Sequence, residues 1–366
     1  MKILEICPFS AGICGVWNRV LSESKEFVKL GYEVMVFSSN IEKGTAKIAS
    51  SEENIGKIKI KRFISKQDFL DKLISGNVTY FSFEDELTNL KPDIVITHLL
   101  HPHSFKALRL CEQQNIPCYL VTHAPFNVKR NFILSILTEI YRLIKVKSKI
   151  NKFTKIIAIT QWEKPYLLKL GIPEEKIVYI PNGIPEEFFK QKINKKPTKD
   201  VLFLGRIAPV KNLETLIEAA KKIPKITFSI VGPAEEKYLE KIKGLIGNSL
   251  NVNILPPVYD LKEKIKLIDN HKIFVLPSKR EAMPQVLIEA MSRGKLVISS
   301  ETDGGKEILE NSKNGFLFEI GNSEHLSRLI QENINGNKDI REQAKTDSIK
   351  YAWKNLIKKY NFLFEK

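Results

Sequence analysis

Two glutamates, Glu281 and Glu289, stand eight residues apart in the stretch PSKREAMPQVLIEA, residues 277–290. Before them, KIFVLP is typical of a buried strand, and Pro284 is favoured as the first residue of a helix. The free backbone N–H groups of Gln285–Leu287 would form the positive end of that helix, which suits a phosphate. We therefore expect the two carboxylates on either side of an anion-binding site, with Glu289 on the flank of the helix's apolar stripe.

Two cations follow another predicted strand. Arg206 and Lys211 come directly after VLFLG, residues 201–205. Either cation alone means little in a chain with 58 lysines and arginines. Their position is informative, because ligands of parallel α/β sheets bind outside the carboxyl ends of the strands.

Histidines end two predicted strands of the first half. His98 follows DIVIT, and His123 lies in VTHAPF. A lone histidine is more often structural than functional. The run HLLHPH, residues 98–103, could suggest a metal site, but no carboxylate or cysteine stands near it in the sequence, so we predict no metal.

These residues need a scaffold of alternating strands and helices. Short β-branched runs alternate with helical patterns, and many of the runs are continuously apolar, as in parallel strands covered on both faces. The sequence therefore predicts an α/β fold of two facing doubly wound, Rossmann-like domains, with the ligand in the cleft between them. The predicted strands are MKILEIC, YEVMVF, KIKIKRFI, DIVIT, CYLVT and KIIAIT in the first half, and DVLFLG, ITFSIVG, NVNIL, KIFVLP and KLVISS in the second.

Length and composition agree with two soluble domains. The chain has 366 residues, 43% hydrophobic and 27% charged, and its polar stretch KQKINKKPTKD, residues 190–200, is the best linker candidate. No run of 18 apolar residues occurs, and MKILEIC is followed by PFSAG rather than by a cleavage site, so we expect a cytoplasmic protein. Four cysteines without CxxC spacing are expected to be reduced packing residues: Cys7, Cys14, Cys111 and Cys118.

The charge of the chain predicts an anionic partner. A net charge of +16 suits a nucleotide, a phospholipid surface or a nucleic acid, and does not choose among them. Apolar residues between positions 131 and 150 form one helical stripe, and basic residues surround it from Lys129 to Lys155. Such a helix can lie peripherally on the inner face of the cell membrane or simply cover the first domain's sheet, and both interpretations stay open.

Several stretches together resemble a known family. SKREAMPQVLIEAM resembles the E-x7-E signature of the retaining glycosyltransferases of family 4 (glycosyl transferases group 1), which have the GT-B fold. FLGRIAPVKNLETLIEAA, PNGI, GKLVISSETDGGKEILENSKNGFLF and the glycine loop PFSAGICGVW agree in order and spacing. YAWKNLIKKY is similar to the family's last helix, which crosses back onto the first domain. The resemblance implies an acceptor-side domain at 1–185, a nucleotide-sugar-binding domain at 186–346 and the crossing helix at 347–366.

The resemblance also implies roles for single residues. Glu289 would bind the ribose hydroxyls of a nucleoside-diphosphate sugar, and Glu281 would hold hydroxyls of its sugar. Arg206 and Lys211 would face the diphosphate, which gains negative charge as it leaves. Gly15 would let the backbone approach the same phosphates. The donor side would further include Met283, Pro284, Gln285, Val286, Gly304, Gly305 and Glu307.

The resemblance gives the histidines a supporting place. His123 corresponds to a first-domain histidine close to the reacting centre, and His98 is the second choice. A front-face reaction is favoured for these enzymes, with the departing phosphate helping to deprotonate the acceptor, so His123 receives a positioning role and not that of a base. No metal and no cofactor besides the donor substrate are implied. The chain departs from the family pattern at Ala282 and Cys14, each of which replaces a glycine. In the amino-terminal loop, Gly12 and Gly15 remain to give the turn its conformational freedom.

The expected activity is transfer of a hexose or related sugar to an acceptor hydroxyl on a polyprenyl-linked, lipid or cell-surface glycan. Three alternatives stay open: an epimerase or hydrolase on the same fold, a non-catalytic sugar-nucleotide sensor, and a basic nucleic-acid-binding protein. Against the last, no aromatic stacking motif, zinc finger or helix-turn-helix stands out, so no nucleic acid is expected as partner.

Overall fold

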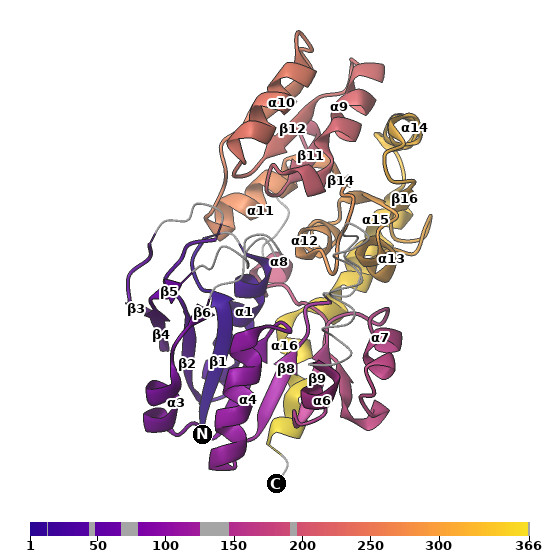
Figure 1. Ribbon diagram of the computed structural model, residues 1–366. Coiled ribbons are helices and arrows are strands. Elements are labelled where there is room, and N and C mark those ends of the chain that lie inside the picture. Colours follow the sequence, from indigo (N-terminus) through magenta and orange to yellow (C-terminus); the bar gives the residue numbers. More distant parts are fainter. Residues whose placement is uncertain (13, 44–47, 67–79, 125–145, 191–195, 365–366) are drawn as a thin grey trace. The chain divides into compact units, whose positions relative to one another are not determined.

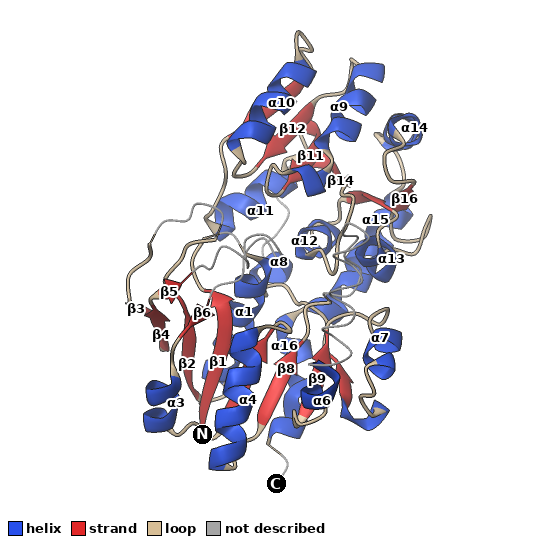
Figure 2. Cartoon of the chain, viewed as in Figure 1, coloured by secondary structure: helices blue, strands red, loops and turns tan. Residues whose placement is uncertain are grey.

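The computed structural model describes residues 1–12, 14–43, 48–66, 80–124, 146–190 and 196–364. The chain divides into two compact units. One is formed by Met1–Asn182 together with Trp353–Lys366, and the other by Gly183–Ala352. Each unit contains a sheet of mainly parallel strands with helices packed on it (Figure 1) (Figure 2). The predicted α/β class, with two doubly wound sheets, is confirmed.

The sheet of the first unit has eight strands in the order β10-β9-β8-β7-β1-β2-β4-β3, and only the β3–β4 pair is antiparallel. The strand order reverses between β1 and β7, which is the point beside which doubly wound sheets bind their ligands. The strands are β1 (Lys2–Phe9), β2 (Glu33–Ser39), β3 (Glu52–Ile55), β4 (Ile58–Phe63), β7 (Ile94–His98), β8 (Cys118–Val121), β9 (Lys155–Ala158) and β10 (Ile177–Tyr179), with β5 (Ser65–Lys66) and β6 (Tyr80–Phe81) in a separate pair. The helices are α1 (Gly15–Lys29), α3 (Glu84–Leu90), α4 (Pro102–Gln114), α6 (Lys147–Ile150), α7 (Lys164–Lys169), η2 (Glu174–Lys176), α16 (Trp353–Leu356) and η5 (Ile357–Leu363).

The sheet of the second unit has six parallel strands in the order β13-β12-β11-β14-β15-β16. Its reversal point lies between β11 and β14, which is where a doubly wound sheet binds its ligand. The strands are β11 (Lys199–Leu204), β12 (Phe228–Val231), β13 (Val252–Leu255), β14 (His271–Leu276), β15 (Leu296–Ser300) and β16 (Phe316–Phe318). The helices are α8 (Glu187–Lys190), η3 (Pro209–Lys211), α9 (Leu213–Lys222), α10 (Glu236–Ile246), α11 (Leu261–Asp269), α12 (Gln285–Ser292), α13 (Asp303–Ile308), α14 (Ser323–Asn333), α15 (Lys338–Ser348) and η4 (Ile349–Tyr351).

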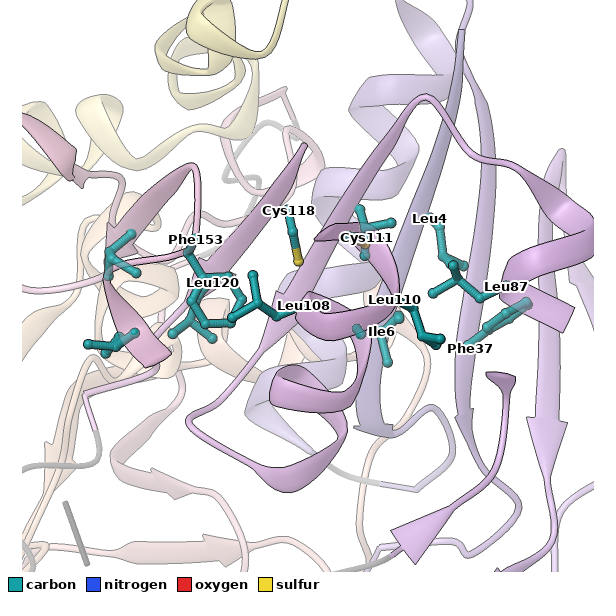
Figure 3. Packing of buried hydrophobic residues seen from close by; sticks show 14 of the residues in the cluster. Leu4, Ile6, Phe37, Leu87, Leu108, Leu110, Cys111, Cys118, Leu120 and Phe153 are labelled. Atoms are coloured by element: carbon teal, nitrogen blue, oxygen red, sulfur yellow. The ribbon is translucent and has the colours of Figure 1, made fainter. Parts of the chain in front are cut away.

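The core of the first unit forms between its sheet and α4. Leu4 and Ile6 of β1 and Leu120 of β8 are fully buried, and Leu108 and Cys111 of α4 belong to the same cluster (Figure 3). Burying a side chain of this size contributes about 1.5–3 kcal/mol, so the apolar strands hold the sheet under the helix. All four cysteines are buried and free, as expected.

All eleven predicted strands are present, and the described residues contain five short strands that were not predicted. These are β3, β5, β6, β10 and β16, each of two to four residues. Segments of this length carry too little periodicity to be recognised.

Two segments near the unit boundaries have clear partners. Phe188 of α8 is fully buried, and its carbonyl accepts a hydrogen bond of 2.8 Å from Arg293, so α8 belongs to the second unit. The final residues belong to the first unit, where Tyr360 packs edge-to-face on Phe27 at 5.3 Å. Within the part of the chain that the structure describes, no helix is long and apolar enough to cross a bilayer.

Candidate active site

The loops after β11 and β14 meet in the second unit. The Lys279 amide donates to the Val210 carbonyl at 2.9 Å, which ties the two loops together. Lys211, at the end of η3, reaches Glu281 Oε1 with its Nζ at 2.5 Å, and Ser278 donates to the same oxygen at 2.6 Å. Oε2 of Glu281 accepts no hydrogen bond from the described residues. The cluster of Lys211, Ser278 and Glu281 thus leaves one carboxylate oxygen for a ligand.

Glu289 lies deeper than the sequence suggested. It was expected on the flank of α12, yet its residue is only 6% exposed. Lys264 of α11 places its Nζ at 2.6 Å from the carboxylate. A buried carboxylate needs such a partner because its charge is costly to desolvate. Nothing in the sequence marked Lys264, since only the packing of α11 beside α12 brings it there.

The start of α12 differs from the prediction by one residue. Pro284 is the N-cap, with φ −75° and ψ 101°, and the helix begins at Gln285. The cap carbonyl accepts a hydrogen bond of 3.1 Å from the Leu287 amide, so the expected free amides are reduced to those of Gln285 and Val286. The side chain of Gln285 donates to the carbonyl of Gly183 at 3.2 Å. Of the other predicted residues here, Met283 and Pro284 are buried and Val286 is half-buried.

Two glycines allow α13 to pack closely on its neighbours, the Glu281 loop and the end of β15. A Cβ on Gly304 would lie 2.6 Å from the Ala282 carbonyl oxygen and 2.8 Å from that of Glu281. The Gly304 amide donates to the Glu281 carbonyl at 3.0 Å. A Cβ on Gly305 would lie 2.6 Å from the Ser300 carbonyl oxygen. A side chain at Gly304 would push away the loop that carries Glu281, and one at Gly305 would overlap the end of β15, so both glycines are required by packing.

Arg206 and Glu307 lie outside the Lys211 cluster in this conformation. Arg206 pairs with Glu235 at 2.9 Å, and both side chains are more than a third exposed. Such an exposed ion pair contributes little to stability, so the guanidinium can leave Glu235 for a ligand at a small cost in free energy. Glu307 on α13 is half-buried, and its charge adds to the effect of burial in raising the pKa of Tyr351.

The glycine loop of the first unit has one strained and one open position. Gly12 has φ +77°, and a Cβ there would lie 2.6 Å from the Lys43 carbonyl oxygen. Gly15 begins α1, and a Cβ there would meet no described atom within 4 Å. Packing inside the protein therefore requires a glycine at position 12. At Gly15, in contrast, the absence of a side chain leaves open space at the start of α1.

The two predicted histidines contact each other. His98 is fully buried, and its Nδ1 lies 2.9 Å from Nε2 of the half-buried His123. Burial lowers the pKa of both rings well below the usual range for histidine, and the charge of Arg19 acts in the same direction. Both rings are therefore neutral at neutral pH, and only His123 has exposed surface.

The other histidines of HLLHPH have structural roles. His101 is the N-cap of α4 and accepts from the His103 amide at 3.4 Å. The ring of His103 contacts the carbonyl of His98 through Nε2 at 2.9 Å. The run therefore does not converge on one ligand position.

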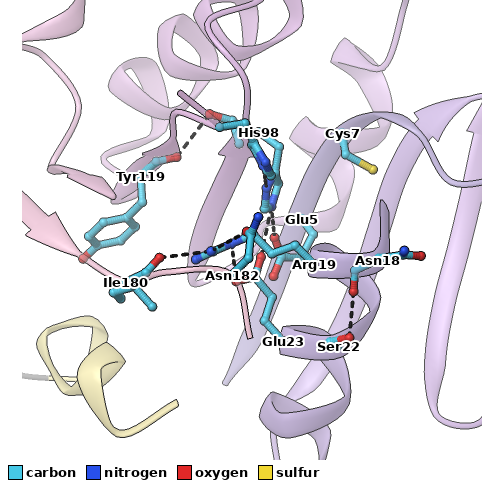
Figure 4. A network of polar contacts seen from close by, with 12 residues as sticks. Glu5, Cys7, Asn18, Arg19, Ser22, Glu23, His98, Tyr119, Ile180 and Asn182 are labelled. Carbon is cyan, nitrogen blue, oxygen red and sulfur yellow. Dashed lines mark hydrogen bonds and ion pairs between the residues drawn. The ribbon is translucent and has the colours of Figure 1, made fainter. Parts of the chain in front are cut away.

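Sequence reasoning missed a buried charged cluster around His98. Glu5 of β1 contacts His98 Nε2 at 2.7 Å, and Glu23 of α1 lies 3.3 Å from the same nitrogen. Arg19 lies 3.3 Å from Glu23, and it also donates to the carbonyl of Ile180 at 3.0 Å (Figure 4). These carboxylates stand far from His98 in the chain; the pairing of β1 with β7 brings Glu5 to it, and the packing of α1 on the sheet brings Glu23.

The ligand atoms of Glu5, Glu23 and His98 lie within 4.8 Å of one another, a spacing that a metal ion could use. The guanidinium of Arg19 already supplies a positive charge to Glu23 in this enclosed space. We therefore assign the cluster to charge compensation.

Comparisons with known proteins agree with this architecture. The family described as Glycosyl transferases group 1 matches residues 184–351, and Glycosyltransferase Family 4 matches residues 13–188. An uncharacterized glycosyltransferase of Haemophilus influenzae is 27% identical over 350 residues, 92% of this chain and 91% of that protein. The UDP-Gal:alpha-D-GlcNAc-diphosphoundecaprenol alpha-1,3-galactosyltransferase of Escherichia coli is 31% identical over 189 residues, 46% of this chain and 48% of that enzyme, so the match spans about half of it.

Solved structures give the fold. Anabaena HepE, solved in complex with UDP and glucose, has a TM-score of 0.74 at 18% identity, over 100% of this chain and 99% of that one. The two family matches together span residues 13–351. The chain is therefore a glycosyltransferase of the GT-B fold that belongs to family 4, the glycosyl transferases group 1.

Proposed function

We propose that this enzyme transfers a hexosyl group from a UDP-sugar to a hydroxyl of a lipid-linked glycan, with retention of the anomeric configuration. The observation that carries the proposal is the cluster of Lys211, Ser278 and Glu281 at the reversal point between β11 and β14. A cation and a carboxylate with one unoccupied oxygen suit a ligand that combines phosphates with sugar hydroxyls.

The chemistry follows from these groups. As the glycosidic bond breaks, the departing diphosphate gains negative charge, and Lys211 stabilises it, with Arg206 turning from Glu235 to assist. Glu281 then orients sugar hydroxyls through Oε2. Glu289, held by Lys264, is oriented for the ribose hydroxyls, and Gln285 and Val286 offer two amides to a phosphate.

The choice of substrates rests on relatives. The Anabaena structure holds UDP, and the Escherichia coli relative is named for a UDP-Gal donor and a diphosphoundecaprenol acceptor. Both point to uridine as the base and to a lipid-linked acceptor.

A thermal-shift panel of UDP-, GDP- and ADP-sugars tests donor binding, because a ligand of the native state raises its stability. We expect a UDP-sugar to stabilise the wild type and not Glu289→Ala. The matched control is Glu240→Ala, which removes an exposed carboxylate of α10 in the same unit and should keep the shift. No shift with any donor would contradict the proposal.

Turnover is the second test. Incubation with the stabilising donor and a short undecaprenyl-diphosphate glycan should give an α-linked product, as detected by NMR of the anomeric proton. Donor binding without product from a range of lipid-linked acceptors would favour the non-catalytic sensor.

Membrane contact belongs to the same proposal. The predicted basic helix falls mainly on residues 125–145, which lie outside the described residues; at its end, Ile150 of α6 is buried in the core. We expect flotation with anionic vesicles but not with phosphatidylcholine vesicles, since each basic residue near such a surface contributes about 1 kcal/mol.

The vesicle test has a charge-matched control. One variant carries glutamine at Lys129, Arg130, Arg142 and Lys145, and the control carries it at four exposed lysines of the second unit, Lys221, Lys225, Lys241 and Lys243. Equal flotation of both variants would exclude residues 129–145 as the contact.

A further inference from the structure

A continuous chain of hydrogen bonds runs from the core of the first unit to its surface. It begins at Glu5 of β1, whose Oε2 lies 2.7 Å from His98 Nε2. It continues from His98 Nδ1 to His123 Nε2 at 2.9 Å. Glu5 and His98 are fully buried, whereas His123 is half-buried. Among the described residues, a change in the protonation of Glu5 is therefore passed through His98 to the partly exposed ring of His123.

Each of the two contacts needs one proton, so the chain has two arrangements. If Glu5 is ionised, His98 donates to it from Nε2 and accepts from His123 at Nδ1, which leaves Nδ1 of His123 without a proton. If Glu5 is protonated, it donates to His98, His98 donates to His123, and Nδ1 of His123 carries a proton. The arrangements differ by one proton at Glu5 and by the hydrogen-bonding character of the outer nitrogen.

The charges of the cluster favour the protonated arrangement. Arg19 is the guanidinium that faces both carboxyls, and it pairs with Glu23 at 3.3 Å. Burial raises the pKa of Glu23 too, but Arg19 and a hydrogen bond of 2.5 Å from Tyr360 oppose this rise. Glu5 has His98 as its only hydrogen-bond partner among the described residues, and its Oε1 has none. A second buried negative charge would have no cation of its own, which is costly.

The surrounding groups act in the same direction. Burial raises the pKa of Glu5 well above its usual range, the charge of Glu23 raises it further, and Arg19 opposes both. Other titratable or charged groups face the chain of bonds from the neighbouring elements, namely Cys7 of β1, Lys43 after β2, His103 of α4 and Tyr360 of η5. Of these, Lys43 acts on the outer ring, since its charge lowers the pKa of His123.

The backbone fixes the outer ring. His123 and Ala124 have φ of +58° and +49°, values that side chains other than glycine adopt at a cost. The preceding Thr122 donates to the buried Glu163 at 2.5 Å, which anchors the end of β8. A strained residue held on a rigid strand end is the arrangement expected where a side chain must be presented in one direction.

We propose that Glu5 is a positioning residue for the transfer reaction: protonated Glu5 donates to His98, so that His123 presents an Nδ1–H donor to an oxygen of the bound substrate. The inference rests on the proposed function for the identity of that oxygen, a sugar hydroxyl or phosphate oxygen. The proton arrangement itself does not depend on it.

The arrangement can be tested without any substrate. The infrared difference spectrum between wild type and Glu5→Gln near neutral pH should show the carbonyl stretch of one protonated carboxyl. The control is Glu84→Gln, because the Lys106 hydrogen bond and its own backbone contacts lower the pKa of Glu84 despite partial burial, so no such band should be lost. Absence of a Glu5-dependent band would overturn the proposal, as would a stoichiometric metal ion that the Glu5→Gln protein lacks.

The pH profile tests the coupling to catalysis. When pH rises through the raised pKa of Glu5, the proton leaves, the arrangement reverses and His123 loses its outer N–H, so kcat/KM of the wild type should fall on the alkaline side. In Glu5→Gln an amide N–H replaces the carboxyl proton at every pH, and this alkaline fall should disappear. An alkaline limb that is the same in both proteins would overturn the coupling.

A third variant measures the size of the effect. Glu5→Leu cannot donate to His98, and we expect kcat/KM to fall about tenfold. This is the effect of losing one hydrogen bond to a group that is charged or gains charge in the reaction. Circular dichroism and donor-induced thermal shift show whether this variant folds and binds, and Glu5→Gln serves if it does not fold. Failure of the wild type to bind any donor would contradict the proposed function, while the infrared result would still decide the proton arrangement.

Discussion

At the scale of single residues, the site in the second unit contains ion pairs that orient the side chains expected to bind the donor. Lys211 and Glu281 are in contact at 2.5 Å, with side chains only 18% and 12% exposed. Partial burial limits screening by water, so this pair is stronger than the exposed pair of Arg206 and Glu235. The two cations predicted from one motif therefore differ in environment.

We predict that Lys211→Met lowers kcat by about 100-fold, because it removes a cation from the developing negative charge of the leaving group. Steady-state kinetics with saturating donor measures this loss. Lys243→Met is the control, since it removes an exposed lysine of α10 paired with Glu240, and its kcat should stay within a factor of two or so. A similar kcat for both variants would remove Lys211 from the reaction.

We predict that Gly304→Ala lowers the free energy of unfolding by about 1–3 kcal/mol, since its Cβ would overlap the Ala282 and Glu281 carbonyl oxygens. It should also weaken donor binding, because the loop that carries Glu281 must move. Denaturant unfolding and donor-induced thermal shift measure the two effects. Gly244→Ala, in helix α10 with nothing within 4 Å of its Cβ, should instead leave the protein as stable or stabilise it.

At the scale of elements, loops at the ends of strands carry most of the candidate residues, and the helices that follow orient them. The α4 helix is one example, because its N-cap is the buried His101. Burial lowers the pKa of His101 from 6.5 to about 4. A depressed pKa stabilises the folded state above the ordinary histidine range, and this contribution is lost as the pH falls from 6.5 towards 4.

We predict that part of the acid sensitivity of the protein comes from this cap. The shift corresponds to about 3 kcal/mol of stability at neutral pH relative to pH 4. Urea unfolding between pH 7 and pH 4 should give a shallower decline for His101→Asn, which can still cap the helix but does not titrate. An unchanged slope would show that the buried His98 and His103 account for the acid sensitivity instead.

At the scale of the whole molecule, the chain returns to its first unit at the end. The phenol of Tyr360 is fully buried; it donates to Glu23 and accepts from Arg19 at 3.0 Å. Arg19 also lies 5.4 Å from the ring of Trp353. The last residues therefore complete the charged cluster that begins with Glu5.

We predict that Tyr360→Phe lowers the free energy of unfolding by about 1–3 kcal/mol, because two buried charged groups each lose a hydrogen-bond partner. Denaturant unfolding followed by circular dichroism measures the change. Tyr32→Phe keeps its stacking on Phe364 at 4.7 Å and should change stability by less than about 0.5 kcal/mol. If both substitutions changed the free energy of unfolding equally, Tyr360 would stabilise the protein through its ring and not through its hydroxyl.

The long apolar strands, the α/β class and the E-x7-E segment could be predicted from the sequence, because each depends on neighbours within a few residues. The fold class was confirmed, and so was the membership in family 4. Position beside predicted strands and helices also singled out Lys211 and Glu281, whereas His123 was chosen through the resemblance to the family.

Only the tertiary structure decided what those residues touch. Glu5 lies beside His98 because the parallel sheet pairs β1 with β7, and Lys264 reaches Glu289 because α11 packs beside α12. The start of α12 depended on whether the Pro284 carbonyl accepted a bond, which no residue type dictates. The sequence by itself thus determined the elements and the kind of chemistry, whereas the partners, burial and protonation of each group depend on long-range packing.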